Sequence, residues 1–289
     1  MSLFHTTAGT LRAPWRLLLF AAAFLAATIV AQAIISPILL WIFGAVGISE
    51  TVAYYIEAIA ALLATWFSLR FVEKKPWSEI GLHRGALNAR GIALSFLAGG
   101  GAIGIAILIL IATGWLARRS GNAPAWAGPL MRMTLLLLPA AFAEELVARG
   151  YSFTALKDGM GSRWAVVITS AAFGLLHLAN PGANAQSVIL VALAGVFLAV
   201  IRLSTDSLYC AWAAHFAWNW VMAAIFHAPV SGFAFEYPSY RYVDAGPDWA
   251  TGGGWGPESG LPAGVMMLAG IWLVARGRLG ASSRRPSLP

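Results

Sequence analysis

The chain has 289 residues, of which 59% are hydrophobic and only 11% are charged. A soluble globular domain carries about 25% charged residues. With a mean hydropathy of +0.73, the composition excludes an ordinary soluble protein and predicts a polytopic membrane protein. The formal net charge is +7, and the basic residues flank apolar segments. We therefore interpret this charge as a signal of membrane orientation and expect no nucleic-acid partner.

Eight apolar segments could form membrane-spanning helices, which need about 20 mostly apolar residues. The first contains Pro37, which predicts a kink. The fifth, sixth and eighth are short, so we expect them to be tilted or only partly exposed to lipid. We predict an all-α polytopic fold forming a single membrane domain over residues 1–289. The predicted spans are 15–43, 51–72, 90–113, 130–156, 163–180, 186–203, 207–227 and 260–276.

The basic residues also predict the direction of insertion. With eight spans, 15 of the 19 Lys and Arg residues fall on one side, all but Arg118, Arg119, Arg132 and Arg241. The positive-inside rule makes that side cytoplasmic and places both termini there. The loop at 228–259 is then extracytoplasmic, with aromatic side chains expected at the level of the lipid headgroups. We expect an integral protein of a bacterial inner membrane, with membrane lipid as a partner.

Ionisable side chains inside the spans are the functional candidates, because charge at the bilayer centre costs at least about 2.5–3.5 kcal/mol per residue. Glu144 and Glu145 lie in the fourth span, and Arg149 follows one turn later. Glu145 and Arg149 share a helix face and are expected to form an ion pair. Glu144 is rotated by about 100° from Glu145 and points elsewhere. Glu57, in the second span, is interpreted mainly as a residue that hydrogen-bonds between helices, with a place in a cavity as the alternative.

Two histidines and one amide complete the set of polar groups. His177 follows Phe173 by four residues in the fifth span, and His215 precedes Asn219 by four residues in the seventh. Each pair therefore shares a helix face. At a rise of about 1.5 Å per residue, their depths allow Glu144 to meet both histidines within the membrane. A carboxylate, two imidazoles and an amide are the groups of a hydrolytic site, buried between the fourth, fifth and seventh helices.

This inventory predicts a division of roles. Glu144 is the expected general base, and His177 is expected to hold the attacking water. His215 and Asn219 are expected to donate hydrogen bonds to the oxyanion that forms on a peptide carbonyl. The residues expected to support these groups from behind are Glu145, Arg149 and Phe173.

These residues resemble the motifs of a known family. In order and in helical placement they are similar to the CPBP group, which joins type II CAAX prenyl endopeptidases with bacteriocin-processing or immunity proteins of the Abi type. The likeness covers about residues 130–227, a family-like catalytic core, and Glu73–Gly85 looks like the loop ahead of it. The motifs are Glu144-Glu145-x-x-x-Arg149, Phe173-x-x-x-His177 and His215-x-x-x-Asn219.

The resemblance implies an eight-helix intramembrane endopeptidase, a peptide hydrolase that acts on a hydrophobic or lipidated protein or peptide. It implies Glu144 as the catalytic carboxylate and His177 as its water-binding partner, with His215 and Asn219 on the oxyanion side. Eukaryotic members remove the last three residues of prenylated proteins. We do not transfer that specificity, because many bacterial members have no prenylated substrate.

Three alternatives stay open. The first is a zinc-dependent version of the same protease, with Glu144, His177 and His215 as ligands, although the chain lacks the H-E-x-x-H spacing. The second is a transporter in which the intramembrane Glu and His side chains relay protons. The third is a non-catalytic scaffold or immunity protein. In the preferred interpretation no cofactor is needed.

Overall fold

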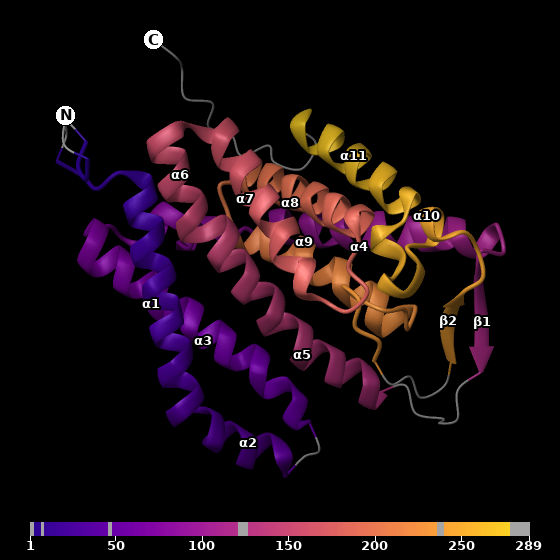
Figure 1. Ribbon diagram of the computed structural model, residues 1–289. Coiled ribbons are helices and arrows are strands. Elements are labelled where there is room, and N and C mark those ends of the chain that lie inside the picture. Colours follow the sequence, from indigo (N-terminus) through magenta and orange to yellow (C-terminus); the bar gives the residue numbers. More distant parts are fainter. Residues whose placement is uncertain (1–2, 7–8, 46–47, 121–126, 236–239, 278–289) are drawn as a thin grey trace.

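Each of the eight predicted spans falls on helix in a computed structural model of the chain (Figure 1). The structure describes all residues except 1–2, 7–8, 46–47, 121–126, 236–239 and 278–289, and of 127–129 only the backbone. The chain is an integral membrane protein, with five described helical segments that are long and apolar enough to cross a membrane. These are Ala13–Ile34, Ser49–Glu73, Ala89–Ala112, Ser162–Ala179 and Ala185–Thr205.

The first predicted span is broken, as Pro37 indicates. It forms two helices, α1 (Ala13–Ile34) and α2 (Ser36–Gly44), which meet at Ile35. Pro37 lies in the first turn of α2, where its missing N–H needs no partner. α3 (Val52–Phe67) then runs back beside α1, and a π-helical segment, η2 (Ser68–Glu73), continues it. These helices form the indigo side of the molecule in Figure 1.

α4 (Ala89–Ala112) packs closely against α9 (Leu208–Trp220), the helix that carries His215. A Cβ atom at Gly99 would lie only 2.0 Å from the backbone oxygen of Ala214. The glycine run at 98–104 therefore serves helix packing. Because Ala214 immediately precedes His215, this contact also fixes the height of the histidine against α4.

We expect Gly99→Ala to destabilise the protein by about 1–3 kcal/mol, because the added methyl group forces α4 away from α9. Gly101→Ala is the matched control, since nothing lies within 4 Å of a Cβ atom there. Unfolding of both variants in the same detergent measures the difference. Equal stability of the two variants would contradict the close contact.

The fourth predicted span is one long, bent helical run. α5 (Ala127–Glu145) is followed by a π-helical turn, η5 (Leu146–Tyr151), and by α6 (Ser152–Met160). Gly150 leaves helical geometry, with φ −84° and ψ −106°. The wide turn thus begins directly after Glu145, and insertions of this type often occur at functional sites.

The fifth to eighth spans are shorter than the fourth. α7 (Ser162–Leu176) ends in a single 3₁₀ turn, η6 (His177–Ala179), and α8 (Ala185–Thr205) starts at a capping box made by Asn184 and Ser187. A π-helical turn, η7 (Val221–Ile225), continues α9. The eighth span is α11 (Leu261–Ala275). The largest buried cluster lies where α4, α5, α9 and α11 meet, and includes Ile103, Ile107, Leu136, Met222 and Met267.

The expectation of an all-α fold is wrong in one detail. β1 (Leu116–Ser120) pairs antiparallel with β2 (Tyr240–Asp244) outside the helices. The guanidinium of Arg118 lies 4.7 Å from the centre of the Tyr240 ring. Arg118, which departs from the charge pattern, therefore lies on this strand pair beside an aromatic side chain.

The loop at 228–259 is also not what its composition predicts. It contains three short helical turns, α10 (Asp248–Thr251), η8 (Gly253–Trp255) and η9 (Pro257–Ser259), and folds back onto the helices. Trp255 is only 1% exposed and packs against Phe173 and Val191, so it does not lie among headgroups. Gly256 permits the turn, with φ +116° and no room for a Cβ atom beside the Pro229 oxygen.

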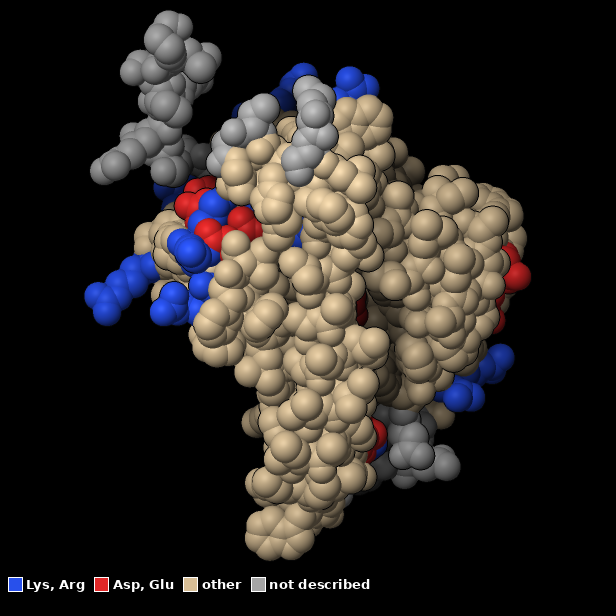
Figure 2. Space-filling view, turned by 60° about the vertical axis from the view of Figure 1, so that its left-hand side comes forward, with Lys and Arg blue, Asp and Glu red and all other residues tan. Residues whose placement is uncertain are grey.

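Charged side chains gather at two ends of the face in Figure 2, with a broad tan surface between them that suits lipid contact. Buried Arg16 pairs with Glu73 and also with Asp158, which ties α1 to η2 and α6. Arg149 is one of the 15 basic residues that the positive-inside rule assigns to the cytoplasmic side, but its side chain is fully buried. Three other counted residues, Arg278, Arg284 and Arg285, lie outside the described residues.

Candidate active site

Glu144 lies at the end of α5, opposite two histidines from other helices. One of its carboxylate oxygens, Oε2, is 3.9 Å from Nε2 of His177 on η6 and 3.9 Å from Nε2 of His215 on α9. These distances exceed a direct hydrogen bond, about 2.7–3.2 Å. They suit one water molecule held between the carboxylate and an imidazole. The fourth, fifth and seventh spans thus bring these three groups together.

The partners of the other ring nitrogens fix how the two imidazoles are turned. Nδ1 of His177 lies 2.7 Å from the backbone oxygen of Phe173, which can only accept a hydrogen bond. Nδ1 of His215 lies 3.0 Å from Oε1 of Glu145, the carboxylate oxygen that also accepts from Arg149. Both Nδ1 atoms therefore carry a proton, inferred from these partners. In the neutral rings, both Nε2 lone pairs then face Glu144.

Glu145 does more than pair within its own helix. The expected ion pair is present, with Arg149 Nη1 donating to Glu145 Oε1 at 2.8 Å and both side chains fully buried. The same oxygen accepts from His215, so Glu145 links α5 to α9. This second link has no signature in the sequence, because it depends on how two distant helices pack.

Phe173 fills the space behind the histidines. Its ring centre is 4.2 Å from the guanidinium carbon of Arg149, 4.7 Å from the His177 ring and 5.9 Å from the His215 ring. A cation over an aromatic face and aromatic edge contacts are both attractive. Phe173 therefore packs against the two imidazoles and the buried arginine.

Asn219 lies one turn after His215 and is 8% exposed. Its amide can donate a hydrogen bond whatever the pH. His215 differs, because with the proton on Nδ1 its Nε2 atom accepts, and it donates only as an imidazolium ion. The oxyanion role expected for His215 therefore requires that ring to be protonated.

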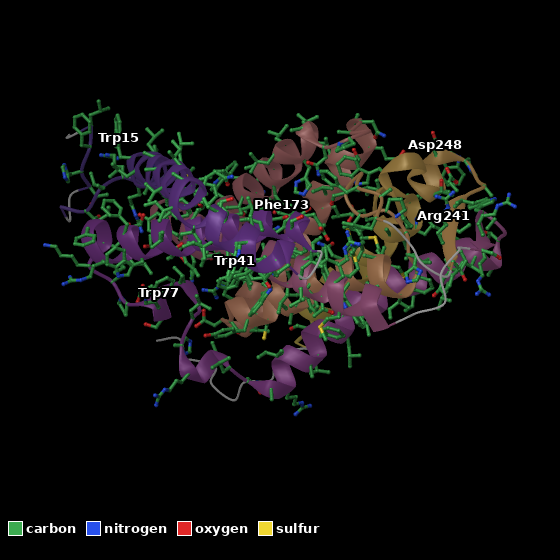
Figure 3. The ribbon with its side chains drawn as sticks, turned by 90° about the horizontal axis from the view of Figure 1, so that it is seen from below. Trp15, Trp41, Trp77, Phe173, Arg241 and Asp248 are labelled. Carbon is green, nitrogen blue, oxygen red and sulfur yellow. The ribbon has the colours of Figure 1, made fainter. Side chains whose placement is uncertain are left out.

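A cavity of about 410 Å³ opens next to these groups. Glu144, His177 and Asn219 line it, and its other walls are mostly apolar side chains from α1, α3, α5 and the segment at 230–235. Figure 2 looks onto a groove between two bodies of tan side chains, with red acidic atoms visible inside it. In Figure 3 the labelled Phe173, which also lines this cavity, lies between the two ends of the molecule.

The folded-back loop closes the other side of the site. Glu258 accepts hydrogen bonds from Trp218 Nε1 at 3.3 Å, Trp255 Nε1 at 3.1 Å and the Ser231 backbone N–H at 2.6 Å. Ser231 and Glu258 also line a small chamber of about 30 Å³ beside His215. We did not predict these two residues; the only sequence signal was a glutamate inside a Trp- and Gly-rich loop.

The proposed zinc ligands do not fit a metal as they are placed. Among the described residues, no group of three or more His, Cys, Asp or Glu side chains is arranged to hold a metal ion. Two ligands at zinc distances of about 2.0–2.1 Å would be roughly 3.3 Å apart in a tetrahedral site. Glu144 is 3.9 Å from each histidine.

Comparison with known proteins agrees with the motifs. Residues 124–221 match the family of type II CAAX prenyl endopeptidases, Rce1-like. The match spans 98 of the 289 residues, counting both ends; it begins three residues before α5 and ends at the first residue of η7. No curated protein and no solved structure matches the chain. The matched stretch contains Glu144, Glu145, Arg149, Phe173, His177, His215 and Asn219.

Proposed function

We propose that this chain, whose residues 124–221 match the Rce1-like type II CAAX prenyl endopeptidase family, hydrolyses a peptide bond within the membrane. Members of this family are peptide hydrolases. One observation carries the proposal: Glu144 Oε2 is 3.9 Å from Nε2 of both His177 and His215. A carboxylate placed in this way can bind and deprotonate a water molecule.

In the proposed reaction, water lies between Glu144 and His177. As its oxygen attacks the peptide carbonyl, Glu144 takes the proton, and the carbonyl electrons move onto the oxygen. The Asn219 amide donates to that oxyanion, and so does His215 when protonated. The carbon–nitrogen bond then breaks, and the proton held by Glu144 passes to the leaving nitrogen. The products are one new carboxyl terminus and one new amine.

The cavity supports a hydrophobic or lipidated peptide as the substrate. Most of its lining is apolar, and it opens beside Glu144. We further propose eight helical passes with both termini in the cytoplasm of a bacterial cell, because most basic residues fall on that side.

Asn219→Ala separates a protease from a transporter. If Asn219 stabilises an oxyanion, its loss should lower hydrolysis about 10²–10³-fold, the effect typical of one lost donor. A proton relay through the Glu and His side chains should tolerate the change. Peptide cleavage and proton flux are measured on the same purified variant in liposomes. Full proteolysis by Asn219→Ala would contradict the proposed oxyanion site.

Two further measurements address the remaining alternatives. Metal analysis of the purified protein tests the zinc-dependent version: stoichiometric zinc that is lost together with activity would overturn the metal-free mechanism. Complementation of a deletion strain by Glu144→Ala tests the non-catalytic scaffold or immunity role. Full rescue by this variant would favour that role over proteolysis.

A further inference from the structure

Glu57 on α3 is a second carboxylate that lines the cavity beside Glu144. It is half-buried, and among the described residues no hydrogen bond or ion pair to its side chain is present. The hydrogen bond between helices that its position predicted is therefore not made. A carboxylate inside a membrane-spanning helix is energetically costly. One that has no hydrogen bond or ion pair to hold it is therefore a functional candidate.

The cavity wall holds two carboxyl groups and no described basic side chain other than a histidine. Its described lining includes the carboxylates of Glu57 and Glu144 but no Lys or Arg side chain. The nearby cation, Arg149, does not line the cavity, because it is fully buried and pairs with Glu145. Tyr54, one turn before Glu57 on the same face of α3, adds a phenol to this wall. Most of the remaining lining is apolar, and its other polar side chains are His177, Asn180, Asn219 and Ser231.

A ligand that binds at this wall of the cavity must suit both its apolar side chains and its carboxylate. Apolar walls favour hydrophobic side chains, and an unpaired carboxylate in a poorly hydrated site attracts a cation more strongly than it would in water. A free carboxylate on the ligand would be repelled by Glu57 and Glu144 alike. The wall therefore fits an internal, hydrophobic stretch of peptide that carries a lysine or arginine.

We propose that Glu57 is a specificity-determining residue that binds a basic side chain of the substrate on the α3 side of the cavity, while Glu144 acts on the peptide bond from the α5 side. This inference rests on the proposed function, because it names the substrate class of the same site. It assigns internal hydrophobic segments with one Lys or Arg as substrates, and it disfavours segments that end in a free carboxylate close to the scissile bond.

Binding to the Glu144→Gln variant tests the proposal without requiring turnover. The probes are short fluorescent Leu/Ala-rich peptides with an amidated C-terminus, in which Lys, Gln or Glu is moved along the sequence. At one or two positions we expect the Lys peptide to bind roughly tenfold more tightly than the Gln peptide. The same peptides with a free C-terminal carboxylate near the Lys position should bind more weakly.

A second substitution assigns the effect to Glu57. Adding Glu57→Gln should abolish the difference between Lys and Gln peptides, and adding Glu57→Lys should favour the Glu peptide. Glu50→Gln is the control, since Glu50 lies in an exposed pair with Arg132. Thermal melting checks folding, and the isosteric Glu57→Gln variant decides the test if Glu57→Lys does not fold.

The outcomes separate this inference from the proposed function. Equal affinity for Lys and Gln peptides at every position, no binding of any peptide, or a Lys preference that survives Glu57→Gln would overturn the role of Glu57. If the Lys peptides bind with the expected preference but wild-type protein does not cleave them, the role of Glu57 stands and the proposed hydrolysis fails.

Discussion

Glu144→Gln is expected to lower the rate of peptide hydrolysis on the order of 10²–10⁴-fold, the usual contribution of a general base. Glutamine has the size and shape of glutamate but cannot take a proton from water. The side chain is 30% exposed toward the cavity and forms no direct hydrogen bond with either histidine at 3.9 Å. Its replacement should therefore leave the fold intact. Single-turnover cleavage of a hydrophobic internally quenched peptide measures the effect.

The control for this prediction is Glu50→Gln, which makes the same chemical change at an exposed ion pair. It should cleave at the wild-type rate. Both variants need melting temperatures close to that of the wild type, so that a loss of rate is not a loss of folded protein. Full activity of a folded Glu144→Gln preparation would rule out the general-base assignment.

Arg149→Ala should have the largest effect on stability, a loss of about 3–5 kcal/mol in the free energy of unfolding. The change leaves the Glu145 carboxylate fully buried without its cation, although that carboxylate still accepts from His215. It also removes the guanidinium from the face of Phe173. Reversible unfolding in mixed detergent micelles measures the loss.

A double variant separates the charge from the packing. Glu145→Leu combined with Arg149→Leu removes both charges together and should recover most of the lost stability. It should not recover activity, because Nδ1 of His215 then has no carboxylate to hold it. Two results would contradict this account of the buried pair. One is a loss of less than about 1 kcal/mol in the free energy of unfolding for Arg149→Ala. The other is normal activity of the double variant.

The sequence predicts much of this site because helical spacing is a local property. Residues four apart share a helix face, which is enough to place Arg149 beside Glu145 and Asn219 beside His215. Matched depths in antiparallel spans are enough to bring Glu144 near both histidines. The distances of 3.9 Å on each side agree with this reasoning.

What the sequence does not predict depends on packing between distant segments. Hydropathy cannot show that Glu145 reaches His215 on α9, or that Trp255 and Glu258 fold back against the site. A Trp- and Gly-rich loop between two spans reads equally well as a segment at the membrane surface. The pairing of β1 with β2 is likewise invisible, because the two strands are separated by more than a hundred residues.

The proposed role of Glu57 is likewise not predictable from the sequence alone. An intramembrane glutamate most often finds a hydrogen-bond partner on a neighbouring helix, so its sequence position favours a structural role. Only the cavity that it shares with Glu144, without a Lys or Arg among the described lining residues, points to a ligand.

The most direct test of the central claim compares cells that carry either the wild-type chain or Glu144→Ala at equal expression. New carboxyl and amino termini in membrane proteins and peptides are mapped by mass spectrometry. We predict paired new termini inside hydrophobic segments that appear only with the wild-type chain. Identical sets of termini in the two strains would contradict the claim that Glu144 activates water for peptide hydrolysis.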